Sequence, residues 1–389
     1  MNRPNILWIC TDQQRYDTIH ALGNSVIRTP NLDRLCDEGV AFTHTYCQSP
    51  ICTPSRTSFL TGLYPSTVHG NMNGNENYNL PENARLVTAR LFDSGYDSGL
   101  SGKLHLASPW EGEEKRVDDG YRKFWYSHDG VKDYNNANQY WTWLKSIGCF
   151  DEVMDTSSSK PEFRSGVKYH RDFPSELHQT TWCCDRAIEF MNEARDGPWL
   201  MSVNIFDPHP PYDAPESLVS NIDPDTMPKP PFTDSDLKVQ KRLSSHLFQS
   251  NPHIPNEGQK KLIANYYAMI ELIDHNVGRL LNELERIAQR ENTVIIFMSD
   301  HGHLLGDHGL VNKGCRFYEG LVRVPLIISC PRHFKTGLKS NGLVELTDLT
   351  PTLCGIAGID SGWTHGQSLL PILTGQSNPQ HHRDFVRCE

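Results

Sequence analysis

Residues 50–62 read Pro-Ile-Cys-Thr-Pro-Ser-Arg-Thr-Ser-Phe-Leu-Thr-Gly. Proline is tolerated in the first turn of a helix, so the short apolar run after Pro54 predicts a helix with Cys52 just ahead of its N-terminus. Free N–H groups and the helix dipole favour negative charge there, and Arg56, one turn on, would add to that field. Taken alone, however, the stretch fits a buried structural thiol better, because free cysteines are usually buried.

Four apolar segments elsewhere are each followed by side chains of the kinds that perform chemistry. The segments are residues 6–10, 96–100, 199–206 and 293–298, and they lead respectively into Asp12 and Gln13, Lys103 and His105, His209, and Asp300 and His301. Near-continuous apolar runs without alternation are typical of strands covered on both faces, as in a parallel sheet. Because ligands bind beyond the carboxyl ends of such strands, we expect all four clusters to meet at one edge of the sheet.

Helical segments lie between these strands. Residues 29–39 have the Thr, Pro and Gly punctuation of a short helix, and apolar residues recur at helical spacing over 179–194 and 256–289. A further strand is predicted over 324–329, and a helix is predicted to begin in residues 350–355. The alternation indicates an α/β fold. Residues 107–178 and 213–256 break this rhythm and are predicted to be irregular insertions near the site or solvated loops.

Composition restricts the partners and the compartment. The chain of 389 residues has a formal net charge of −10, which argues against a nucleic-acid partner and against an anionic membrane surface. Its eleven cysteines include no Cys-x-x-Cys pair and suggest a reducing compartment. The N-terminal apolar run of five residues is too short for a signal peptide or a membrane span. A cytoplasmic protein is therefore expected, or a periplasmic or secreted one if a signal has been removed.

The polar clusters can be read chemically before any family is considered. Asp12, Asp300 and His301 would offer a hard cation oxygen ligands and one nitrogen, and Gln13 could add an amide oxygen; Ca²⁺, Mg²⁺ and Mn²⁺ all suit such a site. The plain alternatives are a helix cap for the aspartate and polar loop surface for the histidine. Similarly, Lys103 alone would be read as a solvated lysine, and His209 as a turn histidine held between prolines.

Several motifs together resemble the type I sulfatases of the alkaline-phosphatase superfamily. The resemblance covers residues 5 to about 375, with the motifs in family order. It rests on Cys52-x-Pro-Ser-Arg followed by Leu-Thr-Gly, on Gly-Lys-x-His at 102–105, on Asp-Pro-His-Pro-Pro-Tyr at 207–212, and on Ser-Asp-His-Gly-His-Leu-Leu-Gly-Asp-His-Gly from residue 299, with Lys313 after it.

This resemblance implies a large, mostly parallel sheet sandwiched by helices and a sulfuric ester hydrolase acting on a carbohydrate or aryl sulfate. A maturase would convert Cys52 to formylglycine, whose hydrated aldehyde is the nucleophile. One divalent ion, Ca²⁺ with Mn²⁺ or Mg²⁺ as alternatives, would be bound by Asp12, Gln13, residue 52, Asp300 and His301. The implied catalytic set comprises Arg56 as an orienting group, Lys103 and Lys313 as transition-state cations, His209 as the acid on the leaving alcohol, and His105 as the base in release of sulfate.

Two departures keep alternatives open. Many sulfatases have Asp-Asp where this chain has Asp12-Gln13, and that pair resembles the branch of phosphonate monoester hydrolases and some choline sulfatases. A phosphonate monoester or phosphodiester hydrolase is therefore one alternative, and an inactive metal- or anion-binding fragment is another. The family also usually continues into a small antiparallel C-terminal subdomain, so we expect a catalytic domain over 1–375 and, in 376–389, the start of a truncated segment.

Overall fold

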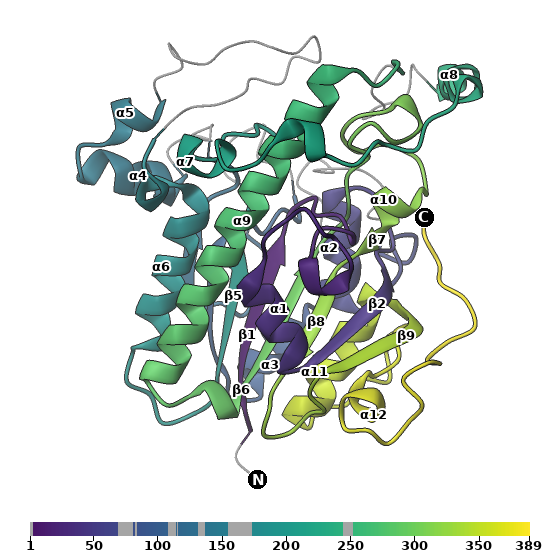
Figure 1. The fold of residues 1–389 in the computed structure, drawn as a ribbon. Helices are drawn as coiled ribbons and strands as arrows, with labels where there is room; N and C mark the ends of the chain where they lie inside the picture. Colours follow the sequence, from purple (N-terminus) through teal and green to yellow (C-terminus); the bar gives the residue numbers. More distant parts are fainter. Residues whose placement is uncertain are drawn as a thin grey trace.

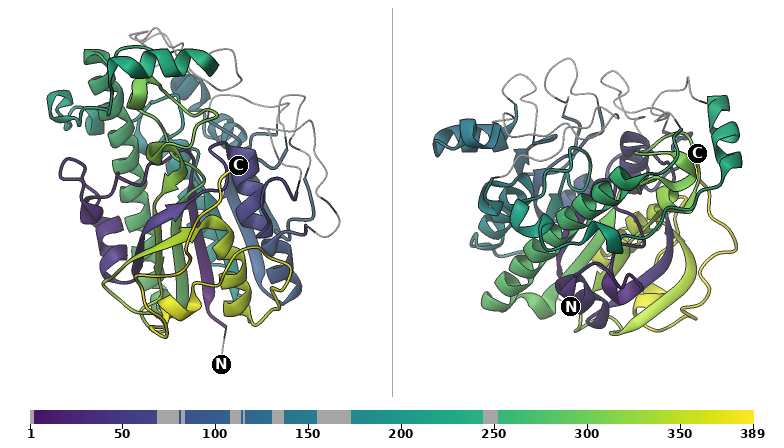
Figure 2. Two further views of the ribbon diagram at one scale, coloured as in Figure 1. Left: turned by 90° about the vertical axis from the view of Figure 1, so that its right-hand side faces the viewer. Right: turned by 45° about the horizontal axis from the view of Figure 1, so that its top comes forward.

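A computed structural model describes residues 3–68, 81, 84–107, 114, 116–130, 137–154, 173–243 and 252–389. Its centre is a mixed, mostly parallel sheet with helices on both faces (Figures 1 and 2). The first strand shows why both faces are covered. Leu7 and Ile9 belong to one hydrophobic core, whereas Ile6 and Trp8 belong to the other. Because successive side chains point to opposite faces, an unbroken apolar strand needs two cores, and the predicted α/β class is confirmed.

The sheet runs in the order β4-β3-β5-β1-β6-β8-β2-β7, with β9 also paired to β2. Strands β4, β3, β5, β1 and β6 are mutually parallel; β8 is antiparallel to β6 and β2, β7 is antiparallel to β2, and β9 is parallel to β2. Their bounds are β1 Asn5–Thr11, β2 Val40–Tyr46, β3 Asp97–Gly102, β4 Lys123–Tyr126, β5 Trp199–Asn204, β6 Thr293–Ser299, β7 Arg323–Val324, β8 Leu326–Ser329 and β9 Leu338–Glu345.

The four strands whose ends carry polar clusters are neighbours in this sheet, in the order β3-β5-β1-β6. Their register levels the carboxyl ends. Thr11 at the end of β1 lies opposite Ser299 at the end of β6, and Gly102 at the end of β3 lies opposite Asn204 at the end of β5. The segments that follow these strands therefore emerge along one edge, as the sequence predicts.

Helices α1 (Pro30–Asp37), α6 (Gln179–Met191) and α9 (Glu257–Arg286) pack on one face. On the other face lie α2 (Cys52–Thr61), α3 (Val87–Asp93), α11 (Leu349–Ala357) and α12 (Leu370–Leu373). The predicted helices are confirmed, and α9 begins where the Asn256 side chain accepts a hydrogen bond from the Gly258 amide. Cys52 is the first helical residue, and extended Ile51 is the N-cap, a shift of one position from the expectation.

The predicted insertions contain more regular structure than expected. The described part of 107–178 includes β4, α4 (Gln139–Ser146), α5 (Phe150–Met154) and a 3₁₀ turn (Ser175–Leu177), and 213–256 includes α7 (Glu216–Val219), a 3₁₀ turn (Pro224–Thr226), α8 (Asp234–Gln240) and another 3₁₀ turn (Lys241–Leu243). Burial of Tyr140 and Leu144 in the core anchors α4. The remaining short elements are α10 (Glu319–Val322) and 3₁₀ turns at His20–Leu22, Arg290–Asn292, Asp307–Gly309 and Leu346–Asp348.

After α12 the chain continues as an extended segment over residues 376–389, all of which are described and lie outside helices and strands. Arg383 pairs with Glu345 at 2.8 Å, and the Glu389 amide donates to the Gln48 carbonyl at 2.7 Å. The Ser66 amide also donates to Glu389 Oε2 at 2.6 Å, so the segment ends against the residues that flank α2 in the sequence. The boundary at residue 375 stays a prediction.

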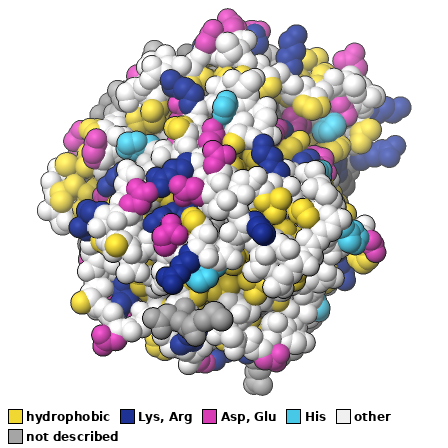
Figure 3. Space-filling model, turned by 60° about the horizontal axis from the view of Figure 1, so that its bottom comes forward, with side chains coloured by type: hydrophobic (Ala, Val, Ile, Leu, Met, Phe, Trp, Pro, Cys, Tyr) yellow, Lys and Arg dark blue, Asp and Glu magenta, His cyan; other side chains and the backbone are white. Residues whose placement is uncertain are grey.

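The face at the opposite end of the strands carries interspersed acidic and basic side chains (Figure 3). On that face the described residues form no stripe of one sign. Among the described helices, none combines the length and apolarity that crossing a membrane requires.

Candidate active site

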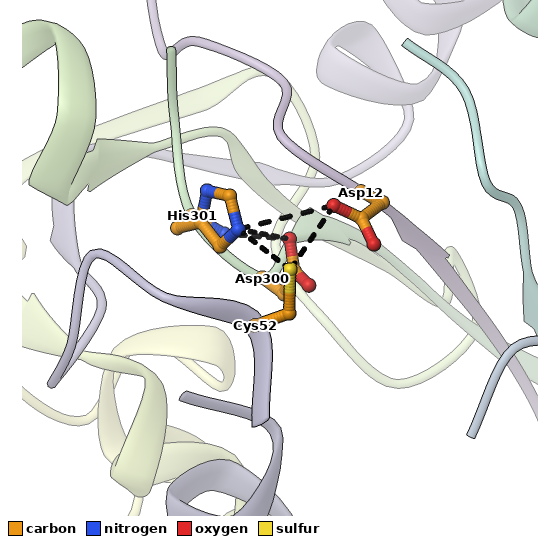
Figure 4. A group of neighbouring side chains, drawn as sticks. All are labelled: Asp12, Cys52, Asp300 and His301. Carbon is orange, nitrogen blue, oxygen red and sulfur yellow. Dashed lines mark hydrogen bonds and ion pairs between the residues drawn. The ribbon is translucent and has the colours of Figure 1, made fainter. Parts of the chain in front are cut away.

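Four buried side chains meet at the carboxyl edge of the sheet (Figure 4). Asp12 follows β1, Asp300 and His301 follow β6, and Cys52 opens α2. Each offers one ligand atom, and these atoms lie within 4.8 Å of one another. The Cys52 Sγ lies 3.1 Å from His301 Nε2 and 3.6 Å from Asp12 Oδ1. The structure therefore brings together three segments that span almost three hundred residues, as the sequence predicts.

Cations turn the two carboxylates toward this cluster. Lys103 Nζ contacts Asp12 Oδ2 at 2.6 Å, and Arg56 Nε contacts Asp300 Oδ2 at 2.8 Å. The other carboxylate oxygens, Oδ1 in both residues, lie 3.8 and 3.9 Å from His301 Nε2. Arg56 also donates to the Lys103 carbonyl at 3.0 Å, so the helix that carries residue 52 is tied to both strand ends.

The negative groups of the cluster are nearly balanced by buried cations that contact them. Burial by itself raises the pKa of Asp12, but Lys103, His209 and Lys313 outweigh it and hold that pKa well below its ordinary value. Lys313 Nζ lies 2.7 Å from the Cys52 Sγ. Burial and Asp12 raise the pKa of Cys52, but the opposing effect of Lys313, Lys103 and His301 is larger, so the pKa lies below its ordinary value. Position 52 thus favours an anion.

Gln13 indicates that a cation belongs here. Its backbone has a φ of 74°, and its amide donates to Asp300 Oδ1 at 3.1 Å. Its side-chain oxygen and nitrogen are both buried without a hydrogen-bond partner, which is rare in folded proteins. An ion held by the two carboxylates would give that oxygen a partner. With one imidazole and an oxygen-rich donor set, the residues fit a hard divalent cation.

The predicted His105 lies beyond the end of β3, and it has an unpredicted neighbour, His128. The two rings meet edge to face with centroids 4.4 Å apart. Burial and the Lys103 charge hold the pKa of both imidazoles well below the ordinary value, so both are neutral at neutral pH. The turn is fixed by Glu114, whose carboxylate accepts from the backbone amides of His105, Leu106 and Ala107.

His209 lies in the loop after β5. Its Nδ1 lies 2.8 Å from the Pro210 carbonyl, so Nδ1 carries the proton and donates, and the ring packs on Phe206 at 4.5 Å. Burial and the Lys313 charge hold the pKa of His209 well below its ordinary value. His209 is therefore neutral in the free protein, because the neighbouring lysine disfavours a second positive charge.

The predicted site residues thus lie together at the sheet edge, and all of them are buried except His209, which is partly exposed. Sequence reasoning missed His128, Glu114, His303 and Thr180. The His303 Nε2 lies 2.5 Å from the Tyr212 hydroxyl, which connects the segment after His301 to the loop that carries His209. Arg15 also donates to the His303 carbonyl at 2.9 Å. His303 stands in the Ser-Asp-His-Gly-His run and could have been found there; Glu114 and His128 lie in the stretch that was interpreted as irregular.

Comparisons with known proteins agree with this geometry. A sequence model of the family described as Sulfatase matches residues 4–359. The chain belongs to the sulfatase family. An arylsulfatase of Clostridium perfringens is 29% identical over 100% of this chain and 81% of its own length, and a choline-sulfatase of Rhizobium meliloti is 30% identical over 96% and 72%. A crystal structure of a phosphonate monoester hydrolase of Agrobacterium radiobacter superposes with a TM-score of 0.84 at 25% identity, covering 98% of this sulfatase and 79% of that chain.

Proposed function

We propose that this sulfatase hydrolyses a carbohydrate or aryl sulfate ester, with a formylglycine at position 52 as the nucleophile. The observation that carries the proposal is the position of Cys52. Its Sγ is buried at a helix N-terminus, 2.7 Å from Lys313 Nζ and 3.1 Å from His301 Nε2, among ligands suited to a hard cation. A reactive oxygen placed there would face both a cation and an imidazole.

Asp12, Gln13, residue 52, Asp300 and His301 would hold one divalent ion, and Ca²⁺ suits this donor set best because four of the five donors are oxygens once residue 52 is a formylglycine diol. When bound, such an ion lowers the pKa of a coordinated hydroxyl and neutralises charge on an anionic ester. The buried, partnerless amide of Gln13 supports this assignment.

The family resemblance implies the roles of the protein groups. A formylglycine diol at position 52 would supply an ionised oxygen as the nucleophile, and Lys103 and Lys313 would stabilise the charge that develops on the sulfate oxygens. His209 Nε2 would protonate the leaving alcohol. It is neutral in the free protein, and the negative charge of a bound ester beside it raises its pKa, so protonation accompanies substrate binding. His105, neutral and buried, would accept the proton that position 52 gives up when sulfate is released. Arg56 holds Asp300 and orients α2.

Intact mass and turnover, measured on the same preparation from a host with a formylglycine-generating maturase, test the proposal. Conversion of Cys52 lowers the mass by about 18 Da, and turnover of 4-nitrophenyl sulfate should scale with the converted fraction. Cys52→Ala keeps the helix and serves as the control without the nucleophile. Full activity in Cys52→Ala would reject the nucleophile, and a converted protein that turns over no ester would support an inactive binding fragment.

A second candidate, hydrolysis of phosphonate monoesters or phosphodiesters, is favoured by Gln13 and by the fold similarity to the Agrobacterium hydrolase. Comparing kcat/KM for 4-nitrophenyl sulfate and 4-nitrophenyl phenylphosphonate in one preparation separates the two. The sulfate ester should be the better substrate, because the neighbouring Lys103 and Lys313 match the three unesterified oxygens of a sulfate ester. A reversed ratio would establish the second candidate.

The same proposal places the enzyme in a reducing compartment. All eleven cysteines are free thiols in the structure. Free thiols are typical of reducing compartments, whereas proteins in oxidising compartments tend to form disulfides. The maturase would then have to act in that compartment. Mass analysis of the alkylated native protein counts the thiols and checks this point.

A further inference from the structure

One histidine of another element lies between the two ends of the loop that carries His209. The loop runs from Asp207 to Asp213, and His178 is the N-cap residue of α6. His178 Nδ1 accepts from the Thr180 amide at 3.4 Å and lies 3.3 Å from Asp207 Oδ2. His178 Nε2 lies 3.8 Å from Asp213 Oδ1, which is beyond hydrogen-bond distance. All three side chains are buried, so one imidazole packs between the residue two before His209 and the residue four after it.

Further bonds fix the first end of the loop against the same helix. The Thr180 hydroxyl donates to Asp207 Oδ2 at 2.5 Å, and the Phe206 amide donates to Gln179 Oε1 at 3.4 Å. The backbone continues this connection into the site, because the Asp12 amide donates to the Asp207 carbonyl at 3.2 Å. The first turn of α6 thus sets the path of the loop relative to the cluster around Asp12.

The His209 ring bonds inside its own loop, to the Pro210 carbonyl, and packs on Phe206. The direction of its Nε2 consequently follows the loop backbone. His178 is only 3% exposed, so a substrate does not reach it. Any influence of His178 on the reaction must pass through the loop.

We propose that His178 is a positioning residue for His209, which fixes the loop so that Nε2 lies where the leaving-group oxygen will be. This inference rests on the proposed role of His209 as the acid. It adds a residue from α6 to the site and predicts a defect with a specific chemical signature. Loss of proton donation harms esters of weakly acidic alcohols, whereas esters of nitrophenols leave without help.

The test uses His178→Asn in the full-length, matured enzyme. Asparagine is a favoured N-cap residue, so α6 keeps its cap, but its side chain is too short to bridge Asp207 and Asp213. His382→Asn is the matched control, because the His382 ring is also buried and pairs with an aspartate, Asp348, at 3.2 Å, but in the C-terminal segment. Thr180→Val, which removes the hydroxyl on Asp207 at constant shape, is the second variant should His178→Asn fold poorly.

The measurement is kcat/KM over a series of sulfate esters from nitrophenols to alkyl alcohols. We expect His178→Asn to lose about 10- to 100-fold on alkyl sulfates, as for a misplaced acid, and less than about threefold on 4-nitrophenyl sulfate. His209→Ala should show the same steepened dependence. The double variant should be no worse than His209→Ala, because both changes remove one function. His382→Asn should match the wild type.

An equal loss on every ester, or losses that multiply in the double variant, would overturn the inference; an equal loss relieved by added Ca²⁺ would show that His178 acts through Asp12 instead. A wild type that hydrolyses no sulfate ester would refute the proposed function and this inference with it, whereas an active wild type with an unaltered His178→Asn profile would refute the positioning role alone.

Discussion

Replacing Gln13 should change stability little in the ion-free protein and should reduce the stabilisation that a divalent ion gives. Its side-chain amide is buried, and neither polar atom has a hydrogen-bond partner. Such a group costs about 1–3 kcal/mol of desolvation in the ion-free protein. Gln13→Ala removes that cost along with some packing, and the φ of 74° is equally strained for both residues. We therefore expect the ion-free variant to unfold within about 1 kcal/mol of the wild type.

In the proposed ligand set the same amide oxygen binds the ion, and its loss should then weaken Ca²⁺ binding by about 10- to 100-fold, or about 1.4–2.7 kcal/mol. The assay is thermal unfolding in a chelator and in saturating Ca²⁺, with calorimetric titration for the affinity. The Ca²⁺-dependent rise in Tm should be smaller in Gln13→Ala than in the wild type, because stabilisation by a ligand follows its dissociation constant.

Gln14→Ala is the matched control. Gln14 is also buried, but its oxygen accepts from the Thr11 hydroxyl at 3.0 Å and its nitrogen donates to Thr18 at 3.1 Å. Its loss should lower Tm equally in chelator and in Ca²⁺, since no ion depends on it. If Gln13→Ala behaves like Gln14→Ala, the amide is not a ligand and the reasoning from its missing partners is refuted.

The remaining predictions concern charge and protons. Lys103→Met should weaken Ca²⁺ binding and lower kcat about 10²- to 10³-fold, because Lys103 both orients Asp12 and stabilises the transition state. Lys313 contacts residue 52 and not a carboxylate, so Lys313→Met should lower kcat by a similar factor and leave the Ca²⁺ affinity, measured by titration, unchanged. Since burial and Lys313 hold the pKa of His209 well below its ordinary value, its acid form is lost as pH rises, so the ratio of alkyl to nitrophenyl sulfate turnover should fall with rising pH and stay flat in His209→Ala. Burial raises the pKa of Asp274 from 3.8 to about 6, so folding disfavours its charged form, and the stability of the protein falls as pH rises through this window. The difference in Tm between Asp274→Asn and the wild type should therefore be more positive at about pH 7.5 than at about pH 4.5. A difference that does not change with pH would contradict the raised pKa.

Strands that are covered on both faces could be predicted from the sequence, and strands at the sheet periphery could not. Strands β1, β5 and β6 occur in apolar runs because two cores pack on them, whereas β3 reads Asp-Ser-Gly-Leu-Ser-Gly although it is buried from Ser98 on. By contrast, β9 reads Leu-Lys-Ser-Asn-Gly-Leu-Val-Glu and is partly exposed along its length, and β4 has only four residues at the sheet edge. Such strands depend on pairing and on context more than on burial, so their composition carries little signal.

The site could be predicted to the same degree and for the same reason. Side chains directly after a buried strand, such as Asp12 and Asp300, have their position set by the sheet, and the sequence shows it. His128, Glu114 and His178 owe their position to the folding of long connections back over the edge, and residue type alone does not reveal that. Their contacts, which hold the His105 turn and the His209 loop, exist only in the assembled structure.

The two oxygens of each carboxylate have different partners, and this difference explains how an acidic protein builds a site for an anion. In Asp12 and in Asp300, Oδ2 is held by a buried cation, and Oδ1 is left facing the cluster. Lys103 and Arg56 thus do more than cancel charge: they fix the carboxylates in the orientation that a divalent ion requires before it arrives. With Lys313 on residue 52, three buried cations face two carboxylates and the anion that position 52 favours, so the cluster is nearly neutral within a chain of net charge −10, and a bound ion would make it positive. Because these cations are buried, salt screens them little, and the attraction for a sulfate ester is a property of the sheet edge and not of the protein surface.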